Sequence, residues 1–126
     1  MKLFSLVFTL FISLSAFSKN IEINLTASQN HNINYNFGLT RLGSPNYVRF
    51  YLINHETEII PFAHAYIYGA DFSATHNCQA GIPAKGRCTV EIRYWPLFEG
   101  FNSGQLEMHF ADNNDFRFYL YGEARR

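Results

Sequence analysis

Tyr-Val-Arg-Phe-Tyr-Leu-Ile-Asn, at positions 47–54, is the stretch of sequence that decides the fold class. Val48, Phe50 and Leu52 fall on one side of an extended chain, and the residues between them fall on the other side. Successive side chains of a β-strand point to opposite faces of the sheet. The alternation therefore predicts a strand with one buried face and one outward face.

The same alternation recurs before and after this stretch. It is found at residues 21–25, 88–94, 105–110 and 116–121. No segment of ten or more residues carries a good helical period. About seven short strands separated by turn signals indicate an all-β chain, and they favour a single seven-stranded β-sandwich over its alternative, a small closed barrel.

Weaker patterns fill the space between these strands. Residues 29–36 are rich in Asn and predict a loop that opens into a short strand, whereas residues 59–68 predict a mixed strand interrupted by Pro61. Residues 69–73 predict a short turn-and-edge segment. The predicted core is made of the inward positions of the regular strands: Val48, Phe50, Leu52, Val90, Ile92, Tyr94, Leu106, Met108, Phe118 and Leu120.

The composition excludes two broad classes of protein. Hydrophobic residues make up 48% of the chain and charged residues 16%, so the chain can bury a core and disorder is excluded. The formal net charge is zero, with no cluster of Lys and Arg that would attract a nucleic-acid backbone. We therefore expect no nucleic-acid partner.

The first 18 residues have the pattern of a secretory signal peptide. A positively charged start is followed by an apolar run over residues 3–14, and Ala16 and Ser18 are small residues before the expected cleavage site at Lys19. The alternative is a membrane anchor, but this run is shorter than the roughly 20 residues that span a bilayer. We expect one domain at residues 19–126, without a transmembrane span, in the periplasm or outside the cell.

Two cysteines, Cys78 and Cys88, lie in the expected mature part of the chain. In an exported protein, two cysteines indicate one disulfide bond, and the Gly and Pro residues between them allow the chain to turn back. A metal-binding pair is the alternative, but a second pair of ligands at the spacing of a zinc site is missing. The sequence therefore predicts a Cys78–Cys88 disulfide.

Several short elements, in this order and spacing, resemble the ASH or hydin-type domains, which include bacterial "choice-of-anchor D" repeats. They are Phe37-Gly38, 47–54, 69–73, 82–90, 94–96, Gly100 with 103–106, and 120–122. The resemblance implies an immunoglobulin-like β-sandwich that acts as a binding or structural module, and it brings no catalytic residue or cofactor. The chain departs from the pattern by holding one copy rather than repeats, and by Trp95, where the family more often has a small polar residue.

Motifs that carry chemistry are weak in this sequence. The five His residues form no His-x-His or His-Glu-x-x-His pair, and no Gly-x-Ser-x-Gly motif is present. His76 and Asp71 near Cys78 are the closest approach to a metal cluster, and a disulfide would remove the thiolate from it. We expect no catalytic residue, metal or cofactor, although a site assembled from distant strands stays open.

The outward aromatic and Arg residues are the candidate partner-binding site. Strands 47–54 and 88–94 are expected to be neighbours in one sheet, which would bring together Tyr47, Arg49, Tyr51, Arg93 and Trp95. Tyr, Trp and Arg are enriched at binding hot spots. The alternative is structural, because such residues also stabilise sheets through cross-strand pairs and Arg–aromatic contacts.

The last two strands are expected to pair in the other sheet and to bring His109 near Tyr119 and Tyr121. From these observations we expect an exported, non-catalytic protein of the binding, adhesion or structural type, with an unknown protein or cell-surface partner. The alternatives are a periplasmic assembly factor or chaperone-like protein that uses an edge strand, and a small inhibitor or metal-binding protein.

Overall fold

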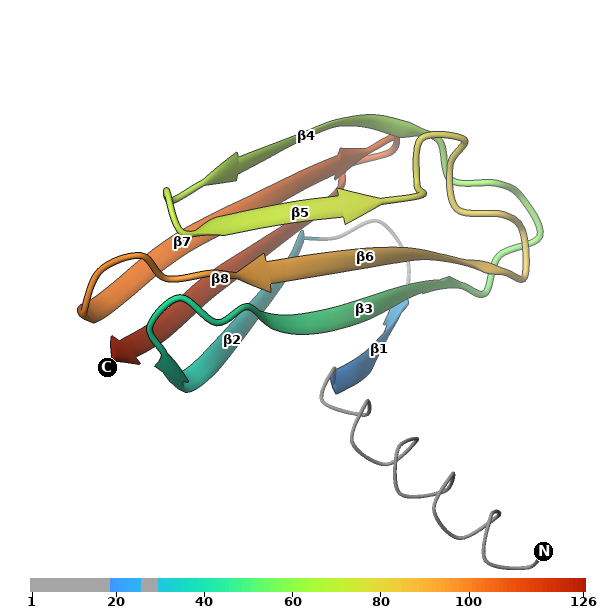
Figure 1. The fold of residues 1–126 in the computed structure, drawn as a ribbon. Helices are drawn as coiled ribbons and strands as arrows, with labels where there is room; N and C mark the ends of the chain where they lie inside the picture. Colours follow the sequence, from blue (N-terminus) through green and yellow to red (C-terminus); the bar gives the residue numbers. More distant parts are fainter. Residues whose placement is uncertain (1–18, 26–29) are drawn as a thin grey trace, which may run out of the picture.

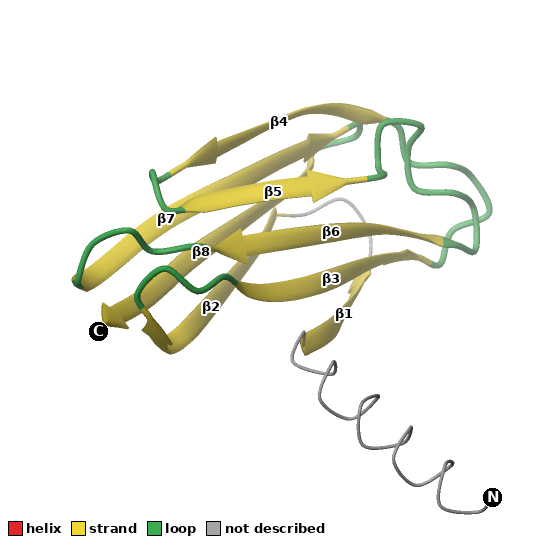
Figure 2. Cartoon of the chain, viewed as in Figure 1, coloured by secondary structure: helices red, strands yellow, loops and turns green. Residues whose placement is uncertain are grey.

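The computed structural model describes residues 19–25 and 30–126, so the predicted signal peptide lies outside the described residues. The described chain consists of strands and loops (Figure 1, Figure 2). The strands are β1 (Lys19–Leu25), β2 (Asn30–Arg41), β3 (Asn46–Asn54), β4 (Phe62–Tyr68), β5 (Phe72–His76), β6 (Arg87–Tyr94), β7 (Gly100–Phe110) and β8 (Asn114–Arg125). Among these residues, no helix has the length and apolar character needed to cross a membrane.

The strands form two four-stranded sheets that face each other (Figure 1). Sheet A has the order β1-β3-β6-β5, and sheet B has the order β2-β8-β7-β4. Inside each sheet the pairs are antiparallel, whereas β1 and β2 add in parallel to the edges of β3 and β8. The chain is therefore a β-sandwich and not a closed barrel.

The structure has eight strands where the sequence predicted seven. The segment expected to be a short turn and edge continues into β5, which pairs with β6 from Phe72 opposite Tyr94 to His76 opposite Val90. The alternation of β5 is hard to recognise in the sequence. After the buried Phe72, its inward positions are Ala74 and His76, which are only weakly hydrophobic.

The segment at 29–36, expected to be a loop that opens into a short strand, is strand from Asn30 onward: residues 30–36 belong to the twelve-residue strand β2, and Gln29 lies outside the described residues. The expected strand is therefore confirmed, and it starts earlier than predicted. Its asparagines alternate with Ile33 and Tyr35, which pack against the core, so they occupy the outward positions of a strand. The parallel ladder with β8 supplies the backbone hydrogen bonds that Asn-rich segments otherwise find in turns.

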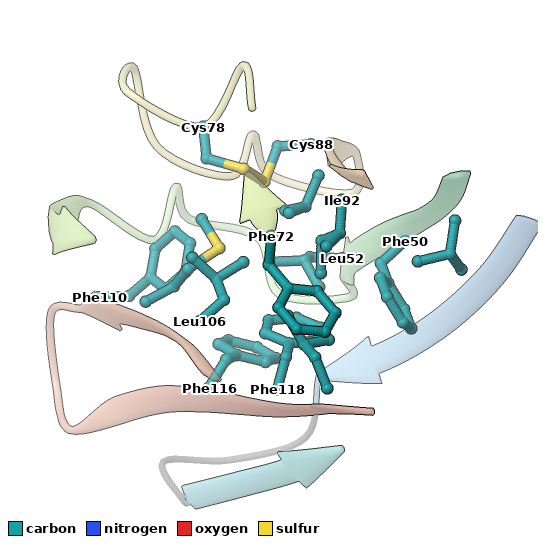
Figure 3. Packing of buried hydrophobic residues seen from close by; sticks show 14 of the residues in the cluster. Phe50, Leu52, Phe72, Cys78, Cys88, Ile92, Leu106, Phe110, Phe116 and Phe118 are labelled. Atoms are coloured by element: carbon teal, nitrogen blue, oxygen red, sulfur yellow. A yellow bond between two sulfur atoms is a disulfide. The ribbon is translucent and has the colours of Figure 1, made fainter. Parts of the chain in front are cut away.

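All ten predicted core residues are buried between the sheets. Aromatic side chains dominate this core and meet from both sheets (Figure 3). The rings of Phe50 and Phe118, one from each sheet, have centroids 4.9 Å apart, and Phe72 stacks on Tyr94 at the same distance. Offset and tilted contacts of this kind add to the gain from burial.

Two glycines make room for these aromatic rings. A Cβ at Gly104 would lie 2.6 Å from the ring of Phe72, and a Cβ at Gly122 would overlap the ring of Tyr94. The hydroxyl of Tyr94 accepts a hydrogen bond from Asn102 Nδ2 at 2.6 Å, while burial raises the pKa of this phenol. The glycines thus let Tyr94 lie in the core with its polar end satisfied.

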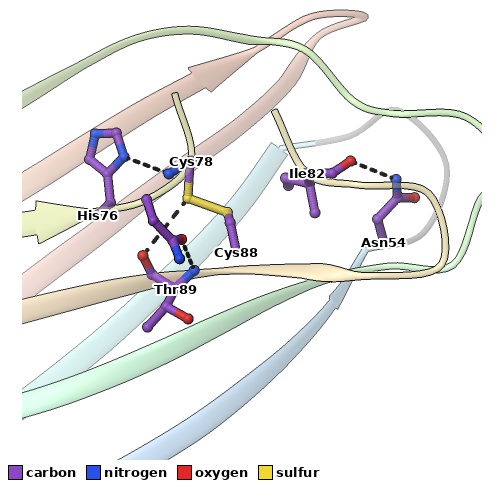
Figure 4. Close-up of a disulfide and its surroundings, with 7 residues drawn as sticks. Asn54, His76, Cys78, Ile82, Cys88 and Thr89 are labelled. Carbon is purple, nitrogen blue, oxygen red and sulfur yellow. Dashed lines mark hydrogen bonds between the residues drawn. A yellow bond between two sulfur atoms is a disulfide. The ribbon is translucent and has the colours of Figure 1, made fainter. Parts of the chain in front are cut away.

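One end of the sandwich is closed by the predicted disulfide, which the structure confirms (Figure 4). Cys78 and Cys88 are bonded with their Cα atoms 5.3 Å apart, and both side chains are buried. We call this end, which carries the β3–β4 loop at 55–61 and the β5–β6 loop at 77–86, the disulfide end.

Candidate protein-binding surface

The structure brings the predicted partner-binding residues together on the outer face of sheet A. In the ladder between β3 and β6, Tyr47 lies opposite Arg93. Two positions further along, Arg49 lies opposite Glu91. Trp95 directly follows β6, so it lies at the end of this face rather than within it. The predicted pairing of the two strands is therefore confirmed.

The Arg residues on this face are engaged by neighbouring side chains. Arg49 forms an ion pair with Glu91 at 2.9 Å, and this hydrogen bond raises the pKa of the guanidinium. Arg87 lies over the ring of Tyr51, 4.2 Å from its centroid. These contacts leave the centre of the face polar and internally paired, and an exposed pair of this kind contributes little to stability.

Trp95 is fixed by three separate contacts. Its indole Nε1 donates to the carbonyl of Gly43 at 2.9 Å, and its backbone N–H donates to the carbonyl of Asp71 at 2.9 Å. The guanidinium of Arg93 lies 4.8 Å from the centre of the ring. The cation–π contact considered from the sequence is therefore present. Even so, 42% of the Trp95 surface stays exposed, so a rigid apolar ring faces solvent.

The loop that begins at Trp95 exposes further apolar side chains, and we call residues 95–101 the aromatic loop. Leu97, Phe98 and Phe101 are 62%, 75% and 85% exposed. Phe101 and Phe98 are the two most exposed large hydrophobic residues among the described residues. Side chains of this size are rarely left in water together without a partner.

The aromatic loop borders a hollow on each sheet. On the side of sheet A, Trp95 and Leu97 line a shallow hollow together with Phe72. On the side of sheet B, Phe101 lines a second hollow with Leu39 and Tyr121. The loop, which joins β6 to β7 at the end opposite the disulfide (Figure 1), thus borders both hollows.

The aromatic loop was not predicted from the sequence. Its residues have no strand or helix period, so the alternation rules pass over them. One usable signal was the density of Trp, Leu and Phe at residues 95–101, around Pro96 and Gly100, two residues that mark a loop. Large apolar residues in a loop bounded in this way cannot all reach the core.

The expected neighbourhood of His109 is wrong. The ladder between β7 and β8 places His109 opposite Asp115, and the two side chains are 2.9 Å apart. The other ring nitrogen lies 3.3 Å from Glu107, and the ring packs on His64. Within the described residues, no group of three or more His, Cys, Asp or Glu has the geometry to hold a metal ion.

His76, singled out beside Cys78, has a structural environment. Its Nδ1 accepts a hydrogen bond from the backbone N–H of Cys78 at 3.0 Å, and its ring packs against Phe62. Burial lowers the pKa of the His76 imidazole, which favours the neutral form. Because Cys78 is held in the disulfide, this pair contains no free thiolate.

Comparison with known proteins shows the fold. The ASH/PapD-like domain 7 of human CEP192 has a TM-score of 0.56 and 19% identity, over 76% of this chain and 83% of that one. The secreted serine protease VesC from Vibrio cholerae has a TM-score of 0.55 and 16% identity, over 71% of this chain. The match spans only 21% of the VesC chain. The chain thus has the immunoglobulin-like fold of ASH/PapD-like domains. No protein-family model and no curated protein sequence matches the chain.

Proposed function

We propose that this chain is an exported, non-catalytic binding module that recognises a protein or cell-surface partner through the aromatic loop and the adjoining outer face of sheet A. The observation that supports this proposal best is the rigid, half-exposed Trp95 next to Phe98 and Phe101. An immunoglobulin-like or PapD-like fold fits a binding or structural role.

The arrangement has the composition of a binding hot spot. Large apolar side chains at the loop can be buried by a partner, while Tyr47, Arg49 and Arg93 supply a polar border around Trp95. Trp and Arg are among the residues that most often dominate binding energy. Because its N–H groups are already bonded within the chain, Trp95 loses little freedom when a partner covers it.

Export and the absence of catalysis are part of the same proposal. A buried disulfide that closes a loop fits an oxidising compartment. The two histidines with the most elaborate surroundings, His76 and His109, bond to a backbone N–H and to carboxylates rather than to a nucleophile. These contacts account for the positions of both histidines without a catalytic role.

The test is capture of a partner by cross-linking in the envelope and medium fractions of the producing organism, followed by affinity measurements with the purified partner. We expect the double variant Phe98→Ser, Phe101→Ser to weaken binding at least tenfold, or about 1.4 kcal/mol. The control is Ile59→Ser, which removes a half-exposed apolar side chain at the disulfide end. Equal affinity of the loop variant and the control would contradict the proposed site.

A further inference from the structure

Strand β4 leaves one edge of sheet B open. It pairs with β7 on one side, and among the described residues no other backbone hydrogen bond involves Phe62–Tyr68 (Figure 1). Its side chains are unusually exposed for an apolar strand, with Tyr66 and Tyr68 about half exposed and Ile67 39% exposed. An open edge of this kind is a template for pairing with another strand.

The other three edges carry features that discourage pairing. Strand β1 has Lys19 and Glu22 on its edge, and β5 is only five residues long. Strand β2 has a register shift between Asn36 and Leu39 that distorts its edge. In contrast, β4 contains no Lys, Arg, Asp, Glu, Pro or Gly. It is the one edge of the two described sheets that lacks the usual protection.

We propose that β4 pairs antiparallel with β4 of a second copy of this chain, with Tyr66 on the two-fold axis. A bulge between Phe62 and His64 limits the regular part of the strand to residues 64–68, and Tyr66 is the centre of this segment. A two-fold axis through the centre uses the whole regular segment of both copies, which is the isologous arrangement usual for dimers.

The side chains in this register complement each other. On the inward side, Ala65 faces Ile67 of the second copy, so a small residue meets a large one at both positions. On the outward side, His64 faces Tyr68 and the two Tyr66 rings face each other. Aromatic cross-strand pairs of this kind stabilise antiparallel sheets. A register centred on Ala65 would leave a gap at the axis and would include the bulge.

Charge does not oppose the pairing. The formal net charge is zero for the full chain and −1 without Lys2 of the predicted signal peptide, so two copies repel each other only weakly as a whole. The nearest acidic residue on the outward face, Glu107 opposite Tyr66, lies near His109 and Arg117 of its own chain. In the dimer the two Glu107 residues would be three strand spacings apart, about 14 Å, which exceeds the screening length of about 8 Å at physiological salt.

The dimer would present two binding loops in opposite directions. Strand β4 runs from the disulfide end toward the aromatic loop, so antiparallel pairing places the two aromatic loops at opposite ends of a continuous eight-stranded sheet. If the proposed function is right, the dimer could bridge two partner molecules and gain avidity. The pairing itself does not depend on the proposed function.

The first test measures self-association of the protein expressed from the full chain in an oxidising compartment. Because the shared edge is short, we expect a weak dimer with a dissociation constant on the order of 0.1–1 mM. Sedimentation equilibrium from about 10 μM to about 1 mM spans that range. A monomer at every concentration would overturn the proposal and would leave the proposed function untouched, because partner binding is not measured.

The second test locates the contact. Tyr66→Lys places two like charges on the axis and should weaken the dimer at least tenfold, while Tyr119→Lys, on the same face of the inner strand β8, should not. Circular dichroism checks that both variants fold. Equal weakening by both variants, or by neither, would overturn the pairing through β4.

The third test fixes the register. Directly opposed residues in an antiparallel pair have Cα atoms about 4.5–5.5 Å apart, a separation that suits a disulfide bond. In a glutathione buffer, Tyr66→Cys should therefore form a covalent dimer, whereas Tyr68→Cys, which faces His64 of the second copy, should remain largely uncoupled. The native cysteines are buried and bonded, so they do not compete. Preferential coupling of Tyr68→Cys, or equal coupling of both, would overturn the register.

Discussion

At one end of the sandwich the disulfide closes the β5–β6 loop and hydrogen bonds join this loop to the β3–β4 loop, while at the other end the aromatic loop exposes its apolar side chains to solvent. The disulfide end holds the Cys78–Cys88 bond and the backbone bridge between Ile60 and Ile82. At the opposite end, Trp95 is anchored but Phe98 is not buried. Both ends are built from loops, so being a loop does not decide whether a segment is rigidly packed.

The disulfide end holds residues that stabilise the fold, whereas the aromatic loop holds the residues proposed to contact a partner. Loops that carry binding residues are usually presented on a scaffold fixed elsewhere. Here the aromatic core and the disulfide end stabilise the scaffold. The aromatic loop is not needed for this purpose and can therefore expose its side chains. Substitutions at the disulfide end should therefore lower stability, and substitutions in the aromatic loop should lower affinity.

The largest effect is expected at Asn54, the buried residue that ties the two loops of the disulfide end together (Figure 4). Its Nδ2 donates to the carbonyls of Glu58, Ile82 and Pro83, and its Oδ1 accepts from the backbone N–H of Glu56. Asn54→Ala should lower the free energy of unfolding by about 3–4 kcal/mol, because it leaves buried backbone groups without partners.

Urea unfolding followed by circular dichroism measures the effect of Asn54→Ala. The control is Asn24→Ala, which removes an Asn side chain whose bond to His55 is exposed. A loss below about 1 kcal/mol at Asn54 would mean that water replaces these bonds easily and that the disulfide end is less rigid than its contacts indicate.

The second prediction concerns the disulfide itself. Replacing both Cys78 and Cys88 by Ala should lower the free energy of unfolding by about 2–3 kcal/mol, the loop-closure entropy of a bridge across ten positions. Denaturant unfolding of the double variant measures this loss. Alkylation without reductant, followed by intact mass, checks the starting protein, and two alkylated thiols in oxidised wild-type protein would contradict the bond.

The sequence predicted the core well because regular strands bury one face each. Alternation alone located residues such as Phe50 and Phe118, since a two-residue period has two faces and only one of them is apolar. Strand β5 was not predicted because Ala74 and His76 weaken its alternation. Its place is determined by pairing with β6, which is a tertiary contact that no local pattern encodes.

The register between strands and the exposure of loop side chains were harder to predict from the sequence. The expected approach of His109 to Tyr119 failed because register depends on the turn at 111–113, where Asp112 and Asn113 adopt left-handed backbone conformations. The outer face was anticipated from the alternation around Arg49, whereas the exposure of Phe98 depends on which loops the fold leaves uncovered.

The third prediction concerns Trp95, which is anchored by contacts within the domain and also exposes part of its ring to solvent. Trp95→Ala removes the contact with Arg93 and the bond to Gly43, so we expect a loss of about 1–2 kcal/mol in the free energy of unfolding. We also expect at least a tenfold loss of partner affinity. Trp95→Phe keeps an aromatic ring at this position but loses the hydrogen bond from the indole N–H to Gly43. This variant should retain most of the affinity.

Measuring both quantities on the same samples of the Trp95 variants separates the two roles. If Trp95→Ala lowers stability and leaves affinity unchanged, then Trp95 only anchors the loop and the outer face of sheet A is not the binding site. The predicted residues Tyr47, Arg49 and Tyr51 would then be explained by cross-strand pairing within the sheet.

The smallest effect on stability is expected where the effect on binding should be large. Phe98→Ser exchanges an exposed apolar side chain for a small polar one, so the free energy of unfolding should change by less than about 0.5 kcal/mol. Thermal and urea unfolding of this variant beside wild type measure the difference. The contrasting control is Phe110→Ser, which removes a buried phenylalanine at the end of β7. A loss of 2 kcal/mol or more at Phe98 would mean that the ring packs on the domain in solution. In that case the aromatic loop would resemble the disulfide end, and the division between a bonded end and a binding end would fail.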